Sequence, residues 1–189
     1  EYSSESFAID ILDVGSIKNL ALKKEVSAII PLNDYGVRTA SVVSYELGLP
    51  GLDPSVIDSV TKKSVMRDKW YQAGVTCPEY IITSSPNEIR DAITKIGLPV
   101  ILKPGEGMGG ASRGIVVIEE HSEIEEAIEF SLSFYDSKIT IVEKFISAVS
   151  EHSAEVLVSE EGSQILTIGD KNKSHLPYRV DLDVRYPTK

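Results

Sequence analysis

The chain has 189 residues, of which 42% are hydrophobic and 25% charged, which is typical of a globular protein with one large or two small domains. Its formal net charge of -10 argues against a nucleic-acid partner, because binding a phosphate backbone requires clustered lysines and arginines. No apolar run approaches the roughly 20 residues of a membrane span, and the single cysteine cannot form an internal disulfide. We therefore expect a cytoplasmic protein without a membrane partner.

The first part of the chain predicts an α/β arrangement. Val26 to Pro31 is a short apolar run that predicts a strand, and Tyr35 to Leu47 places apolar residues at helical intervals. Asp53 to Val60 predicts a short capped helix. The pattern changes near this point, so we expect two domains, residues 1–55 and 56–189.

The remainder predicts an α+β domain in which helices alternate with strands. Helices are expected over Lys62 to Ala73 and from Ser85 to Gly97. A third helix is expected to begin at a capping box formed by Ser122 and Glu125 and to run to Phe134. Its strands, expected to form one sheet, are Tyr80 to Thr83, Pro99 to Leu102, Ile115 to Ile118, Ile139 to Val142, Ala154 to Val158 and Gln164 to Ile168. A turn at Ser159 to Ser163 joins the last two, and no regular pattern is expected after Asp170.

A glycine-rich stretch, Gly105 to Gly114, lies between two of the predicted strands and holds five glycines. Gly105 to Gly110 matches the dinucleotide pattern G-x-G-x-x-G, but strand-forming residues follow where that motif requires a helix N-terminus. The same spacing approaches a P-loop, yet Ala111 stands in the position of the required lysine. Neither motif therefore explains the stretch.

A loop between two strands can still cover a polyphosphate with its backbone N–H groups, and Lys103 at its base is suited to contact phosphate. The alternatives are an ordinary flexible hairpin connection and a lysine that reaches solvent. Because five glycines exceed the needs of a hairpin, the stretch predicts nucleotide binding.

Four segments together resemble the ATP-grasp superfamily, in which a glycine-rich hairpin closes over ATP between two α+β lobes. Lys62 to Pro78 resembles the family's lysine-bearing helix and the turn after it, and Gly97 to Pro104 is similar to its "g.P.v.KP" strand. Gly105 to Ile115 resembles the lid, in the Ser-Arg-Gly form of carbamoyl-phosphate-synthetase-like and carboxylate-amine ligase members. Val142 to Ile146 looks like the hinge between the lobes, and Val26 to Gly51 like the end of a preATP-grasp domain.

The resemblance implies roles for individual residues. Lys63, with Lys62 as the register alternative, and Lys103 would bind ATP phosphates. The backbone at Lys144 and Ile146 would bind the adenine edge, and Glu151 would bind ribose hydroxyls. No specific role is assigned to Lys171, Lys173 or Arg179. The residues expected to bind ATP are thus Lys63, Lys103, Gly107, Gly109, Gly110, Ser112, Arg113, Gly114, Glu143, Lys144, Phe145, Ile146 and Glu151.

The resemblance also implies an activity: an ATP-dependent ligase that converts a carboxylate or bicarbonate to an acyl phosphate, which an amine then attacks. The family binds Mg²⁺ through acidic residues on late strands, but no glutamate follows Gly162, and Asp170, Asp181 and Asp183 substitute poorly. We therefore expect an ATP-grasp fragment that ends before the metal-binding strands and is inactive alone. The alternatives are a non-catalytic nucleotide-binding module and a scaffold for a protein partner; a homodimer stays open.

Other chemistry is not expected. His121, His152 and His175 lie far apart with no metal-ligand spacing, so no metal site is predicted within the chain. Cys77 precedes a proline in a turn and is not expected to be a nucleophile. The sequence identifies no catalytic residue.

Overall fold

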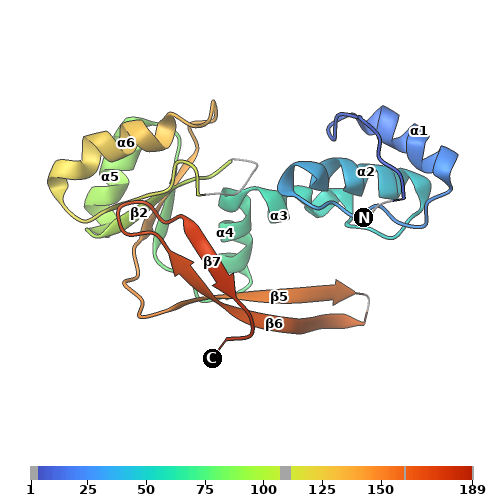
Figure 1. Cartoon of the computed structure of the whole chain (residues 1–189). Coiled ribbons are helices and arrows are strands. Elements are labelled where there is room, and N and C mark those ends of the chain that lie inside the picture. Colours follow the sequence, from blue (N-terminus) through green and yellow to red (C-terminus); the bar gives the residue numbers. More distant parts are fainter. Residues whose placement is uncertain (1–3, 107–111, 160, 189) are drawn as a thin grey trace. The chain divides into compact units, whose positions relative to one another are not determined.

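The computed structural model describes residues 4–106, 112–159 and 161–188 and divides into two compact units (Figure 1). The first unit runs to Val75 and includes Glu106, and the second runs from Thr76 onward through the rest of the described chain. Each unit has its own secondary structure and its own buried residues.

The first unit is helical. Asp13 caps its first helix by accepting a hydrogen bond from the Ser16 amide, and Gly48 ends the second in a left-handed conformation at φ 65°. Asp53 caps the following short helical segment, as predicted. The predicted strand at Val26 to Pro31 is wrong, because no other strand in the described part of this unit is present to pair with it. The elements are α1 (Val14–Lys24), η1 (Asp34–Gly36), α2 (Val37–Leu47), η2 (Pro54–Val56), α3 (Ile57–Thr61) and α4 (Lys63–Gln72).

The second unit contains a four-stranded antiparallel sheet, called sheet A, with strand order β1-β4-β2-β3. β4, one of its two central strands, is rich in β-branched residues, which suit a buried pleated surface. All four strands were predicted within two residues of their observed ends. They are β1 (Tyr80–Thr83), β2 (Val100–Pro104), β3 (Val116–Ile118) and β4 (Thr140–Lys144).

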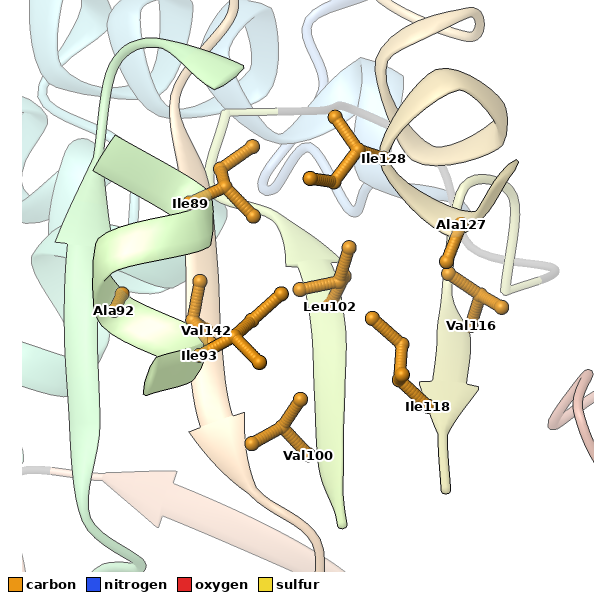
Figure 2. Packing of buried hydrophobic residues seen from close by; sticks show 10 residues of the cluster. All are labelled: Ile89, Ala92, Ile93, Val100, Leu102, Val116, Ile118, Ala127, Ile128 and Val142. Atoms are coloured by element: carbon orange, nitrogen blue, oxygen red, sulfur yellow. The ribbon is translucent and has the colours of Figure 1, made fainter. Parts of the chain in front are cut away.

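Helices α5 (Pro86–Ile96) and α6 (Ile124–Leu132) cover one face of sheet A (Figure 2). The Ser85 hydroxyl caps α5 by accepting a hydrogen bond from the Glu88 amide, as the sequence predicts. The predicted capping box of Ser122 and Glu125 is wrong: Glu120 and Glu123 form it, around the 3-10 segment η3 (His121–Glu123). The core between helices and sheet comprises Ile89, Ala92, Ile93, Val100, Leu102, Val116, Ile118, Ala127, Ile128 and Val142.

The remaining strands form a separate antiparallel sheet, called sheet B, with order β5-β6-β7, so the expectation of a single sheet is wrong. Its strands are β5 (Glu151–Ser159), β6 (Gly162–Lys173) and β7 (Asp181–Arg185). The β5–β6 hairpin turns at the predicted place, but β6 runs beyond Asp170 and β7 was not predicted. Several apolar side chains of the hairpin are exposed: Val156, Leu157, Val158, Ile165 and Leu166.

None of the helices within the described ranges combines the length and hydropathy needed to cross a bilayer.

Candidate nucleotide-binding site

Lys103 and Glu143 form an ion pair on sheet A, with 3.0 Å between Nζ and Oε2. The register pairs Ile101 with Glu143 and Lys103 with Ile141, so the two charged residues are diagonal neighbours on one face. That face is opposite the one that packs against α5 and α6, because Leu102 and Val142 belong to the helix-covered core. Glu143 is only 3% exposed. The ion pair therefore joins the base of the glycine loop to the strand that leads into the hinge.

Close packing holds both ends of the glycine loop. The Gly105 amide donates to the Ile139 carbonyl at 2.8 Å, and a Cβ at Gly105 would lie 2.7 Å from the Ile139 side chain. Gly114 has φ 72°, and its carbonyl accepts a hydrogen bond from the Ser131 hydroxyl at 2.8 Å. These two glycines thus have a structural role.

The remaining predicted loop contacts stay predictions. Ser112 is half-buried and Arg113 is exposed. Gly107, Gly109 and Gly110 lie outside the described residues. The role of these five residues in phosphate binding, and that of Gly114, is not tested by the geometry.

The last residue of β4 and the residue after it, in the segment predicted to be the hinge, both have engaged amides. The Lys144 N–H donates to the Glu79 carbonyl at 2.8 Å, and the Phe145 N–H to the Pro99 carbonyl at 3.1 Å. The Ile146 N–H has no acceptor among the described residues, and the Ile146 side chain is 62% exposed. If this segment binds a purine, the donor that remains is the Ile146 N–H.

The side chain of Lys144 has a structural role that sequence reasoning missed. Its Nζ donates to the carbonyls of Gly97 and Leu98, each at 2.9 Å, just beyond the end of α5. A cation at this position satisfies two main-chain carbonyls of the turn that follows the helix. A lysine 47 residues after the glycine that ends a helix gives no sequence signal for this contact.

The two lysines at the start of α4, in the first unit, differ in their ion pairs. Lys62 pairs with Asp58 at 3.0 Å and lies 3.8 Å from the Glu106 carboxylate. Lys63 is half-buried and makes no ion pair within the described part of the chain. Which of the two lysines binds phosphate stays a prediction.

Glu151 belongs to a charge network on sheet B that the sequence did not predict. Its carboxylate accepts a hydrogen bond from Arg179 at 2.7 Å and pairs with Lys173 at 3.2 Å. Asp181 pairs with the same Lys173 and, at 3.0 Å, with Lys171. Three cations thus surround two carboxylates. The ribose-binding role of Glu151 remains a prediction, and its carboxylate is already engaged in the ligand-free chain.

The network shifts the pKa values of its members. Burial raises the pKa of Glu151, but the hydrogen bonds from Arg179 and Lys173 outweigh it and hold the pKa below its ordinary value of 4.5. Burial likewise opposes the shift at Asp181, whose pKa the two lysines lower from 3.8. For Lys173, burial lowers the pKa, yet its two carboxylate partners raise it above 10.5 overall. Glu151, Asp181 and Lys173 are therefore ionised at neutral pH.

These directions predict a pH dependence of stability. Because the folded-state pKa of Glu151 is depressed, its contribution is present above about pH 4.5 and is lost as pH falls through the lowered value. Glu151→Gln should therefore destabilise the chain at pH 7, and the difference from wild type in urea midpoint should shrink below pH 4.5. Glu161→Gln, in the exposed β5–β6 turn, is the control. A Glu151→Gln difference that stays constant down to pH 3 would refute the prediction.

Within the described ranges, no group of three His, Cys, Asp or Glu residues is placed to hold a metal ion. The donors needed for Mg²⁺ are therefore not identified in this part of the chain.

Comparison with known proteins places this geometry in a family. The family model described as "ATP-grasp domain" matches residues 69–174. Formate-dependent phosphoribosylglycinamide formyltransferase of Francisella tularensis subsp. novicida is 28% identical over 153 residues, which is 77% of this chain and 38% of that protein. The chain spans only 36–38% of the length of such curated relatives.

Solved structures agree with the fold. N5-carboxyaminoimidazole synthetase from Staphylococcus aureus, complexed with ADP, matches 93% of this chain and 46% of its own, with a TM-score of 0.76 and 16% identity. The biotin carboxylase domain of Hydrogenobacter thermophilus 2-oxoglutarate carboxylase, complexed with MgADP and bicarbonate, matches 89% of this chain and 40% of its own, with a TM-score of 0.71 and 22% identity. The predicted fold class is thereby confirmed, and the chain belongs to the ATP-grasp family.

Proposed function

We propose that this chain is the ATP-binding part of an ATP-dependent ligase that activates a carboxylate or bicarbonate as an acyl phosphate for attack by an amine-type nucleophile. The observation that carries the proposal is the Lys103–Glu143 ion pair, which lies between the base of the glycine loop and the hinge. The phosphates and the base of a nucleotide are at opposite ends of the molecule. The glycine loop, on one side of this ion pair, would bind the phosphates. The hinge, on the other side, would bind the base.

Each element has a distinct role in this proposal. Lys63 and Lys103 neutralise phosphate charge, and the glycine loop covers the phosphates and excludes water that would hydrolyse an acyl phosphate. The Ile146 N–H donates to a ring nitrogen of adenine, and the Glu151 carboxylate accepts from ribose hydroxyls. Mg²⁺, when bound, would bridge phosphate oxygens and offset their charge. The solved structures of this fold that are complexed with ADP and with MgADP support nucleotide binding.

Nucleotide binding is tested by thermal shift and calorimetry with ATP, ADP and GTP in the presence of Mg²⁺. ATP at 100 times its dissociation constant should stabilise the chain by about 2.7 kcal/mol. Lys63→Ala should weaken ATP binding by about tenfold or more, the effect of losing one charge-assisted contact, without altering stability in the absence of nucleotide. Lys69→Ala, in the same helix α4, is the matched control. No shift with any nucleotide, or equal effects of the two substitutions, would contradict the proposal.

Ligase activity is a separate question, answered by the full-length protein. ADP release should require both a carboxylate and an amine, supplied for example as a pair of amino acids. A full-length protein that binds ATP but releases no ADP with any such pair would instead be a non-catalytic nucleotide-binding module.

A further inference from the structure

The connection between β6 and β7, residues 174–180, contacts the end of the glycine loop. The Ser112 hydroxyl donates to the Arg179 carbonyl at 2.7 Å. The Val117 amide donates to the Pro177 carbonyl at 3.0 Å, and the rings of Tyr178 and Phe130 lie 5.0 Å apart. The connection is thus fixed at three points to the segment that follows the loop and to α6.

The side chain of Arg179 makes a contact in sheet B. Its guanidinium donates to Glu151 at the start of β5 at 2.7 Å, and the side chain is 27% exposed. The carbonyl of Arg179 therefore binds Ser112 at the end of the loop, while the side chain of Arg179 is bound by Glu151. A guanidinium with several donors in a fixed plane is well suited to fixing the course of its own backbone.

Ser112 adopts a backbone conformation that requires support. Its φ is 56°, in the left-handed region that non-glycine residues rarely occupy and that surrounding contacts must maintain. Its carbonyl accepts from the Ile115 amide at 3.1 Å, and its hydroxyl donates to Arg179. The second of these contacts comes from a segment 67 residues away, so it depends on how residues 174–180 are held.

We propose that Arg179, held by Glu151, is a positioning residue that fixes Ser112 to Gly114, the return of the glycine loop. Glu151 acts on the loop through Arg179 without touching it. The effect on nucleotide binding rests on the proposed function, in which the glycine loop covers the phosphates. The geometric part, from Glu151 through Arg179 to Ser112, can be tested without nucleotide.

The first test is hydrogen exchange of the Val117 amide, followed by NMR in the ligand-free chain. Arg179→Ala should speed this exchange at least fivefold, because residues 174–180 lose their hold on sheet B and the Pro177 carbonyl moves. Arg179→Lys, which keeps one donor for Glu151, should restore part of the protection. Arg185→Ala removes an exposed ion pair with Asp183 on the same sheet and should change nothing. Unchanged exchange in Arg179→Ala, or equal acceleration in Arg185→Ala, would overturn the proposal.

The second test asks whether Glu151 and Ser112 act through the same contact. Glu151→Gln and Ser112→Ala should each speed exchange of the Ile115 amide, and the double variant should exceed the larger single effect by less than twofold, because both changes break one chain of contacts. Effects that multiply would show independent roles and overturn the coupling.

Nucleotide binding then separates the two proposals. Arg179→Ala should raise the dissociation constant for ATP about threefold to tenfold. If exchange responds as expected but the wild-type chain binds no nucleotide, the proposed function fails while the positioning role stands. If ATP binds but exchange does not respond, only the positioning role fails.

Discussion

Lys103→Met should lower the free energy of unfolding by about 3 kcal/mol, because it leaves the carboxylate of Glu143 in a buried site without its lysine. The methionine keeps the length of the side chain, so lost packing contributes little. The added change Glu143→Gln removes the buried charge, and the double variant should recover most of the loss. Urea denaturation at pH 7 measures all three proteins.

The matched control is the exposed ion pair of Arg90 and Glu125, which has a 2.6 Å contact with both side chains well exposed. Arg90→Met should have a much smaller effect than Lys103→Met, because solvent screens such a pair. Equal losses for Arg90→Met and Lys103→Met would show that burial of Glu143 is not what makes the lysine important. The expected instability also means that a Lys103 variant alone is a poor probe of nucleotide binding. Lys63→Ala is the better probe.

Gly114→Ala should also cost about 3 kcal/mol. A left-handed φ of 72° costs an alanine roughly 1 kcal/mol, and the added Cβ would lie 2.9 Å from Cγ of Pro104 and 3.1 Å from the Ser131 carbonyl, which adds about 2 kcal/mol of overpacking. The Ser131 carbonyl belongs to α6 and cannot move independently of the helix. Urea denaturation measures the loss.

Gly48→Ala separates the cost of the left-handed backbone from the cost of overpacking. Gly48 has φ 65°, and a Cβ there would meet nothing within 4 Å, so only the backbone term of about 1 kcal/mol is expected. A loss at Gly114 no larger than the loss at Gly48 would rule out the packing contribution. It would also leave phosphate contact as the better reason for a glycine at residue 114.

Local signals predicted most of the second unit. Ser85 and Gly97 mark the two ends of α5 through a cap and a positive φ, both of which follow from the residue type at that position. The strand at Val26 to Pro31 failed because an apolar run requires a pairing partner, which local sequence does not show. Strand β7 was missed because Asp181 and Asp183 make it charged, and their partners Lys173 and Asn172 lie on a neighbouring strand.

For the candidate site too, the sequence predicted some features and missed others. Lys103 was proposed because it stands next to the glycine stretch, and Lys63 because of the resemblance to the family's lysine-bearing helix; both roles stay predictions. The ion pair of Lys103 with Glu143 could not be predicted, because it depends on the register between β2 and β4, 40 residues apart. The link from Ser112 to Glu151 spans even longer separations and passes through a main-chain carbonyl, which any residue type provides.

The exposed apolar side chains of the β5–β6 hairpin affect how the chain behaves at high concentration. Val158 is 72% exposed and Ile165 is 61% exposed, and β5 is an edge of sheet B in the described part of the chain. Such an edge favours pairing between copies, whereas a net charge of -10 keeps them apart. Salt shortens this repulsion from a range of about 10 Å at 0.1 M to about 3 Å at 1 M but leaves apolar contact intact. Raising the ionic strength should therefore promote self-association and lower solubility.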